Sequence, residues 1–182
     1  MKELRTNTRE LSHFDVHLIL AYWYTADEFY LRSLGADINK LPPKKVMEDM
    51  LLKQLKSKYS VKSIYAIIWE LDDIPIGHCN VNQINFGKSA FMHLHLWDDE
   101  HREKGIGTKL VLQSLPYFFE NLNLKLLYCE PSALNPAPNK TLQKVGFDFE
   151  MKHITTPGSI NFEQEVNRWK LTKAQYEALY RP

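Results

Sequence analysis

The spacing of hydrophobic positions changes along the chain and divides it into a helical first third and a strand-rich remainder. In residues 43–57, apolar side chains recur three or four positions apart, at Val46, Met47, Met50, Leu51 and Leu55. This spacing places them on one face of an amphipathic helix. From residue 63 onward, β-branched and aromatic residues gather in short runs bounded by turn residues, a pattern that is typical of strands.

The region before that helix is rich in aromatic residues and predicts two further helices. Within residues 13–34, Thr25 is followed three positions later by Glu28, which is the spacing of a capping box. We therefore expect one helix to end near Tyr24 and another to begin there. Residues 1–12 are polar and predict at most a short leading strand.

The second part of the chain predicts six strands and three helices. The strands are expected at residues 63–71, 74–84, 89–97, 125–129, 147–154 and 165–171. The helices are expected at residues 105–121, 138–145 and 172–180. Strand 125–129 follows a helical crossover, so it should lie parallel to strand 89–97. The order predicts an α+β (α/β) fold in which a mixed sheet of about six to seven strands has flanking helices, in a single domain of residues 1–182.

The amino-acid composition limits the classes of protein to which the chain can belong. The 182 residues are 44% hydrophobic and 25% charged, with a formal net charge of +1. This balance gives no reason to expect a nucleic-acid or membrane partner. The first residues lack the apolar core of a signal peptide, so a cytoplasmic protein is expected. Cys79 and Cys129 are too few for a disulfide framework and lie in strand-like runs, which predicts buried thiols.

A glycine-rich turn joins strand 89–97 to the helix that follows it. Gly105 and Gly107 lie two residues apart, behind the basic residues Arg102 and Lys104. Glycines let backbone N–H groups approach a ligand closely, and a helix N-terminus favours an anion. The turn is therefore a candidate phosphate or pyrophosphate site, although a strand-to-helix turn that simply requires glycine has the same appearance.

Two motifs together resemble those of the GNAT family of acetyl-CoA-dependent N-acetyltransferases. The family's pyrophosphate loop, Arg/Gln-x-x-Gly-x-Gly/Ala, matches residues 102–107, from Arg102 to Gly107. Its second signature, an Asn followed eleven residues later by Gly-Phe, matches Asn135 and the pair Gly146-Phe147. The aromatic N-terminal region is similar to the branch that includes ribosomal-protein and small-molecule N-acetyltransferases.

The resemblance implies the GNAT acyl-CoA N-acyltransferase fold and a direct transfer of an acetyl group from acetyl-CoA to a primary amine. The acceptor would be a small molecule or a protein N-terminus, and the protein would act as a monomer or homodimer. The pyrophosphate would lie on the backbone of residues 104–108, the pantetheine arm along the strand near His95, and Asn135 on the other side of the arm. The implied cofactor-binding residues are Leu96, Trp97, Arg102, Lys104, Gly105, Ile106, Gly107, Thr108 and Asn135.

The catalytic candidates come from strand alternation and from a departure from the family pattern. Alternation places Phe91, His93, His95 and Trp97 on one face of strand 89–97. A histidine with a pKa near 6.5 suits a general base, so His93 and then His95 are candidates, and both are equally open to a structural role. Many family members have a tyrosine acid where this chain has Leu142. Tyr128, a hydroxyl such as Thr141, or water would then protonate the leaving thiolate, or the fairly acidic CoA thiol would leave without a dedicated acid.

The remaining candidates concern the acceptor, a metal and an alternative function. Tyr24, Tyr30, His78 and Glu130 are expected to line the acceptor pocket. A His-x-His pair can supply two metal ligands, but no third ligand has a fitting spacing, so no metal site is predicted. The absence of the family tyrosine leaves open a non-catalytic sensor that binds CoA on the same fold.

Overall fold

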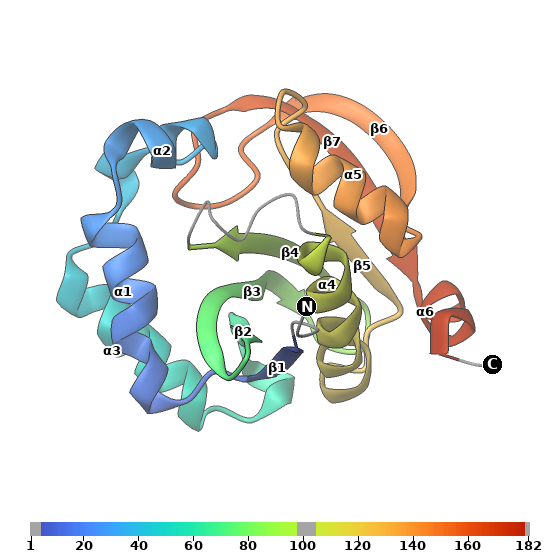
Figure 1. Cartoon of the computed structure of the whole chain (residues 1–182), viewed down its shortest axis with the longest axis horizontal. Helices are drawn as coiled ribbons and strands as arrows, with labels where there is room; N and C mark the ends of the chain where they lie inside the picture. The colour runs from blue at the N-terminus through green and yellow to red at the C-terminus, as the bar shows by residue number, and fades with distance from the viewer. Residues whose placement is uncertain (1–4, 98–104, 181–182) are drawn as a thin grey trace.

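The computed structural model describes residues 5–97 and 105–180. In these residues, seven strands form one mixed sheet in the order β1-β2-β3-β4-β5-β7-β6 (Figure 1). The strands are β1 Thr6–Glu10, β2 Tyr65–Leu71, β3 Ile74–Asn85, β4 Ser89–Leu96, β5 Leu126–Cys129, β6 Asp148–Thr155 and β7 Gln164–Thr172. The helices are α1 Val16–Thr25, α2 Glu28–Ser33, α3 Lys44–Lys56, α4 Ile106–Pro116, α5 Pro136–Val145 and α6 Lys173–Tyr180. A π-helical turn, Tyr117–Asn121, extends α4.

The strand pairing confirms the predicted meander and crossover. Strands β1 to β4 pair antiparallel in chain order, and β4 pairs parallel with β5. Strands β5, β7 and β6 complete the sheet with antiparallel pairs. The parallel pair β4–β5 is therefore the place where the sheet changes direction, and the long α4 crossover connects its two strands.

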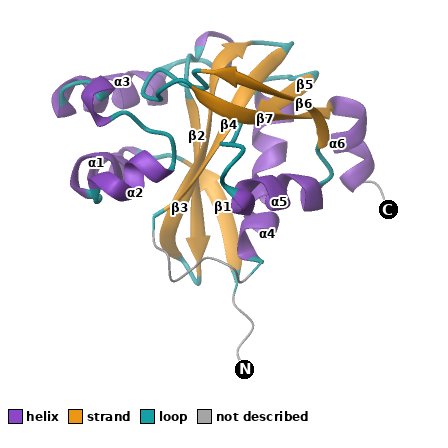
Figure 2. Cartoon of the chain, turned by 90° about the horizontal axis from the view of Figure 1, so that it is seen from above, coloured by secondary structure: helices purple, strands orange, loops and turns teal. Residues whose placement is uncertain are grey.

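The sheet has helices on both faces, and each face has its own hydrophobic core. Figure 2 shows α1, α2 and α3 on one side of the sheet and α4, α5 and α6 on the other. Strand β2 is buried along its whole length, and its side chains alternate between the two cores. Ile67 and Trp69 belong to the core under α4, whereas Ala66 and Ile68 belong to the core under α1 and α3.

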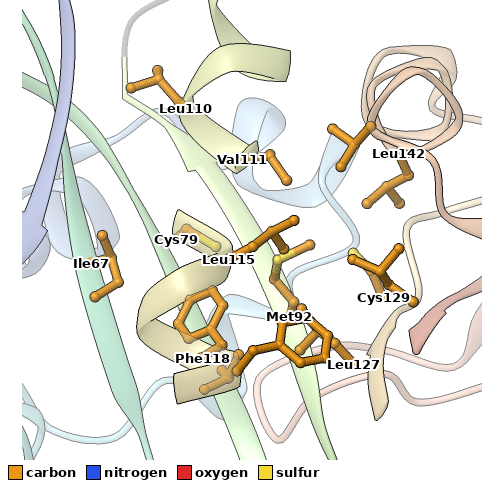
Figure 3. Close-up of a cluster of buried hydrophobic side chains, with 14 of the residues drawn as sticks. Ile67, Cys79, Met92, Leu110, Val111, Leu115, Phe118, Leu127, Cys129 and Leu142 are labelled. Atoms are coloured by element: carbon orange, nitrogen blue, oxygen red, sulfur yellow. The ribbon is translucent and has the colours of Figure 1, made fainter. Parts of the chain in front are cut away.

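The core under α4 and α5 is formed by residues that the strand and helix patterns bring together from distant parts of the chain. Figure 3 shows Leu115 of α4 beside Met92 of β4, and Leu110 of α4 and Leu142 of α5 belong to the same cluster. These four side chains are at most 1% exposed. Burying each contributes roughly 1.5–3 kcal/mol relative to leaving it exposed. Cys79 and Cys129 are free buried thiols in the same core, as predicted.

The predicted break between the first two helices is confirmed, but the predicted cap is wrong. Thr25 is the last residue of α1, and its hydroxyl donates to the carbonyl of Ala21 at 2.8 Å. The N-cap of α2 is Asp27, whose carboxylate accepts the backbone N–H of Tyr30 at 3.0 Å. Glu28 instead forms an ion pair with Arg32. Both Thr and Asp are good N-cap residues, but α1 extends through Thr25, and Asp27 lies directly before the first residue of α2.

The other predicted boundaries agree with the structure to within a few residues. The helix expected over 105–121 is α4 plus the π-helical turn, which begins directly after Pro116, a residue without an N–H to donate. Thr172 caps α6, because its hydroxyl accepts the backbone N–H of Gln175 while the Gln175 side chain accepts the N–H of Thr172.

No helix in residues 5–97 and 105–180 is long and apolar enough to cross a bilayer.

Candidate active site

The centre of the candidate site is a fork between β4 and β5. The last paired residues of these two strands are Met92 and Cys129. Strand β5 ends there, whereas β4 continues to Leu96. The edge of β4 beyond Met92 that faces away from β3 therefore has no strand partner among the residues that the structure describes. An unpaired strand edge in the middle of a sheet presents backbone donors and acceptors to a ligand.

Strand alternation identifies which backbone groups face the opening. The N–H of Trp97 donates to the carbonyl of Ile76 on β3 at 2.9 Å, so Trp97 points toward β3. Residues of opposite parity in β4, Leu94 and Leu96, point the other way, into the fork. Consistent with this direction, the Leu96 carbonyl accepts the hydroxyl of Tyr30 at 3.0 Å.

This geometry changes the expected contacts of the cofactor arm. The backbone N–H of Trp97, which we expected to pair with the arm, is already bonded to β3. The Trp97 indole N–H also has a protein partner, Nδ1 of His78, at 2.8 Å. Leu94 was missed, because the sequence does not show which parity of β4 pairs with β3.

A cavity extends from the fork across the face of β3 and β4 to α1 and α3. Its polar part lies near the fork and includes Asn80, Asn82, His93 and Glu130. Its apolar part is formed by α1 and α3 and includes Ile19, Trp23, Met47, Met50 and Leu51. The loop of residues 157–161 contributes a further wall. The cavity therefore joins the unpaired edge of β4 to an apolar recess under the helices.

His95 and His78 are part of a buried aromatic cluster. Their rings stack with centroids 4.5 Å apart, and the hydroxyl of Tyr22 lies 3.3 Å from Nδ1 of His95. Trp23 packs edge-on against the His95 ring. Burial, together with the nearby His93, lowers the pKa of His78 to about 3. Burial and the neighbouring histidines lower the pKa of His95 well below its usual value. Both imidazoles are therefore neutral and serve packing in this cluster.

His93 lies two residues before His95 on β4, directly after Met92, where the pairing with β5 ends. It differs from the other two histidines in its hydrogen bonding. Its Nε2 is buried and has no hydrogen-bond partner among the described residues. Burial lowers the pKa of His93 to about 4. The expectation of a pKa near 6.5 is therefore wrong, and the cause is desolvation of the charged imidazole. His93 is unprotonated at neutral pH, the form that a base requires, although it holds a proton weakly.

Glu130 follows the last residue of β5 and lines the cavity, but its charge is already compensated. Its Oε1 accepts Nε of Arg168 at 2.5 Å and lies 3.2 Å from Nε2 of His153. The Glu130 side chain is only 5% exposed. A buried carboxylate that is paired with a guanidinium has a structural role, and it attracts a further cation only weakly.

Tyr128 lies just before the fork, on the same face of β5 as Glu130. Its ring stacks on Phe91 with centroids 5.1 Å apart, and the guanidinium of Arg168 lies 5.6 Å from the ring centroid. Tyr128 therefore lies beside the fork, and the guanidinium of Arg168 lies over its ring. Leu142, at the position of the family tyrosine, is completely buried in the core and contributes no polar group.

The two tyrosines expected in the acceptor pocket have different surroundings. Tyr30 reaches the fork through its bond to Leu96. The hydroxyl of Tyr24 donates to the carbonyl of Pro42 instead. Neither tyrosine is among the described residues that line the cavity. Trp23 lines the cavity in place of Tyr24. These two residues are adjacent on α1 and therefore point in different directions. Which of them faces the cavity depends on where α1 begins.

The start of α4 has the features of an anion site. Gly105 adopts a left-handed conformation with φ of 72° and no side chain caps the first turn, as judged from the described residues. The N–H groups of Ile106, Gly107 and Thr108 are therefore directed at the space before the helix. A Cβ at Gly105 would meet no atom of the described residues within 4 Å.

The other residues expected at the cofactor are partly described. Arg102 and Lys104 lie outside the described residues. Asn135 lines the cavity, and its side-chain oxygen caps α5 by accepting the N–H of Ala137 at 3.3 Å. Thr141 has its hydroxyl 3.8 Å from the place of a Cβ at Gly107, beside the α4 N-terminus rather than the fork. An uncapped helix start next to an unpaired strand edge fits a long ligand with a phosphate group, such as acetyl-CoA.

Comparison with known proteins decides the family. Residues 5–148 match the family model described as the acetyltransferase (GNAT) domain. The chain belongs to the GNAT acetyltransferase family. It is therefore an acetyl-CoA-dependent N-acetyltransferase, and acetyl-CoA is its cosubstrate. The matched residues include both sequence motifs and the β4–β5 fork.

Solved structures of two GNAT enzymes share this fold at low sequence identity. A spermidine N-acetyltransferase from Vibrio cholerae, in complex with CoA and spermine, is 21% identical with a TM-score of 0.75, over 94% of this chain and 98% of that one. An aminoglycoside acetyltransferase in complex with coenzyme A is 15% identical with a TM-score of 0.71, over 96% of this chain and 98% of that one. No curated protein matches the sequence. The structural likeness confirms the fold that the motifs predicted.

Among the described residues, no group of three or more His, Cys, Asp or Glu side chains is arranged to hold a metal ion.

Proposed function

We propose that this GNAT enzyme acetylates the primary amine of a small molecule at the fork between β4 and β5. The observation that carries the proposal is the unpaired edge of β4 at the mouth of a cavity. The edge offers backbone groups to the cosubstrate, and the cavity offers a separate space for an acceptor. The two substrates would thus meet beside His93.

The cosubstrate would enter from the α4 side of the fork. The N–H groups at the start of α4 would hold the pyrophosphate, because a helix N-terminus favours an anion. The backbone N–H of Leu96, which is nearer that helix, would pair with the pantetheine arm. The N–H of Leu94, deeper in the fork, would face the thioester carbonyl and stabilise the negative charge that develops on its oxygen.

The chain's own residues would then orient and deprotonate the acceptor. The cavity holds the amine against the thioester, and such positioning removes much of the entropic barrier of a bimolecular reaction. His93 presents a neutral imidazole on the cavity face of β4 and would accept the proton of the attacking amine, directly or through water. Tyr128 is the nearest candidate acid of β5, and a CoA thiol is acidic enough to leave without one.

A pair of variants at Leu94 tests this assignment. Leu94→Pro removes the N–H that faces the fork without removing a bond of the β3–β4 ladder, and Leu94→Ala shortens the same side chain but keeps the N–H. We expect Leu94→Pro to lower kcat by about a hundredfold relative to Leu94→Ala, as for the loss of an oxyanion donor. CoA affinity and unfolding curves of both variants report whether the fork is intact.

Equal kcat values for the two folded variants would refute the role of Leu94. The wild-type protein in the same assay, run over a panel of amines, addresses the reaction itself. CoA binding with no turnover on any amine would instead favour the sensor alternative.

A further inference from the structure

Few charged side chains line the described part of the cavity, although the structural neighbours of this enzyme acetylate spermidine and aminoglycosides. Of its described lining residues, Glu130 is the single carboxylate, and none is a lysine or an arginine. Glu130 is already held by Arg168 at 2.5 Å and flanked by His153. The cavity therefore has no uncompensated negative charge in its described part.

The acids in the middle of α3 share one lysine. On α3, Glu48 and Asp49 both lie 3.0 Å from Nζ of Lys45. Neither of these carboxylates lines the cavity, which meets α3 at Met47, Met50 and Leu51. The face of α3 that the cavity contacts is thus apolar, and the charged face is directed elsewhere.

From these observations we propose that the acceptor carries one amine on an apolar body, and that a second ammonium group is rejected. This inference rests on the proposed function and specifies its substrate class. The reacting amine would lie at the polar end, near His93 and the fork. The rest of the acceptor would lie in the apolar recess formed by Ile19 and Trp23 of α1 and by Met47 and Met50 of α3.

The physical reason is desolvation. A second ammonium in the recess would lose its water without gaining an anionic partner among the described lining residues, which is costly for any buried charge. A hydrocarbon chain in the same place gains by burial, by about fourfold in affinity for each methylene that leaves water. Methionine side chains are flexible and adapt to differently shaped apolar groups. The recess therefore selects for the absence of charge more strongly than for one shape.

Three amines with the same six-carbon chain provide a direct test with the wild-type enzyme and acetyl-CoA. Hexylamine, 6-aminohexan-1-ol and 1,6-diaminohexane share one reacting end and differ only at the other. We expect kcat/KM to be at least tenfold higher for hexylamine than for the diamine, with the amino alcohol between them. The diamine has two reactive ends, which gives it a statistical advantage over hexylamine. The expected order therefore holds only if the recess disfavours the second ammonium by more than this advantage.

A diamine acetylated as well as hexylamine, or better, would overturn the proposed acceptor class while leaving the proposed function intact. Acetylation of none of these three amines, with turnover on other amines of the panel, would overturn this inference alone. CoA binding without turnover on any amine of the panel would overturn the proposed function and this inference with it. The two failures are therefore distinguishable in one experiment.

A substitution on α3 tests where the far end of the acceptor lies. Met50 lines the recess and is 44% exposed, so Met50→Glu is expected to fold. It would place an unpaired carboxylate opposite the second ammonium, whereas Met50→Gln is the neutral control of the same size. We expect the ratio of kcat/KM for the diamine over hexylamine to rise about tenfold in Met50→Glu and to stay within twofold in Met50→Gln. An unchanged ratio in both variants would refute the placement of the acceptor against α3.

Discussion

At the scale of single residues, the three histidines on β3 and β4 have the same chemistry but different surroundings. His78 and His95 have partners in a stacked aromatic cluster. His93 has a buried Nε2 without a partner among the described residues. Buried polar atoms are normally hydrogen-bonded, and exceptions are often found at functional sites. This contrast is the reason for preferring His93 over His95 as the base.

Substituting His93 tests its role as the base. We expect His93→Gln to lower kcat by about a hundredfold, the lower range for the loss of a general base, with CoA affinity unchanged. Because burial lowers the pKa of His93 to about 4, its imidazole stays neutral from pH 8 down to about pH 5. The wild-type kcat should therefore show no inflection near pH 6.5 that belongs to His93.

The control for this experiment is His95→Gln, which alters the neighbouring aromatic cluster. It should lower stability more than kcat. A wild-type inflection near pH 6.5 that disappears in His93→Gln would show that the imidazole is solvated and that its pKa is not depressed. A kcat of His93→Gln equal to that of the wild type would remove His93 as the base.

At the scale of secondary-structure elements, α4 contributes the start of a helix and β4 contributes a strand edge. Neither feature requires a particular side chain, because backbone N–H and C=O groups form both. The glycine turn could be recognised from the sequence because glycines at this spacing precede a helical pattern. The fork could not, because it depends on the residue at which β4 and β5 stop pairing.

A charge at the start of α4 tests the pyrophosphate position. Among the described residues, the nearest neighbour of a Cβ at Gly107 would be Oγ1 of Thr141 at 3.8 Å, so these residues leave room for a side chain. We expect Gly107→Glu to lower CoA affinity at least a hundredfold, because its carboxylate would compete with the pyrophosphate for the same N–H groups. Gly107→Gln, the uncharged control, should lose considerably less, and titration calorimetry with CoA measures both.

The folding of these two variants should be equal or favour the glutamate, which complements the positive end of a helix. A Gly107→Glu protein that binds CoA with wild-type affinity would refute the placement of the pyrophosphate on α4.

The order of helices and strands could be predicted because apolar spacing is a local property of the sequence. The capping of α2 was predicted wrongly because Thr25 and Asp27 are both suitable N-cap residues, and only the phase of α1 decides between them. The environment of Glu130 also depends on a distant residue. Its partner, Arg168, comes from β7, and no local pattern connects the two.

At the scale of the whole molecule, the site lies where the two layers of helices leave the sheet open to a ligand. The core under α4 and α5 fixes β4 and β5 from one side, and α1 to α3 cover the other face. The depressed pKa values of the histidines are a consequence of that cover. They could not be predicted from the sequence, because the covering helix α1 is more than fifty residues away along the chain.

Burial of three neutral histidines also predicts how stability depends on pH. In the folded protein the pKa values are about 3 for His78, about 4 for His93 and well below 6.5 for His95, in each case mainly because of burial. The unfolded chain binds protons at these positions near pH 6.5. Their contribution to stability is therefore complete above pH 6.5 and is lost as the pH falls toward about 4.

Three protons taken up on unfolding give a slope of up to about 4 kcal/mol per pH unit in this window. Urea unfolding between pH 7.5 and pH 4.5 measures it, and His93→Gln should reduce the slope by about a third. His17→Gln, on the exposed face of α1, is the control that should leave it unchanged. A free energy of unfolding that is constant between pH 6.5 and pH 5 would contradict the burial of these imidazoles.

The most direct test of the central claim is to follow acetyl transfer itself. The purified protein is incubated with acetyl-CoA and hexylamine, and CoA release and the amine product are quantified together by mass spectrometry. We predict N-acetylhexylamine and free CoA in equal amounts, both strongly reduced in Leu94→Pro. CoA that is released without an acetylated amine, or a product that forms equally well in Leu94→Pro, would contradict transfer at the β4–β5 fork.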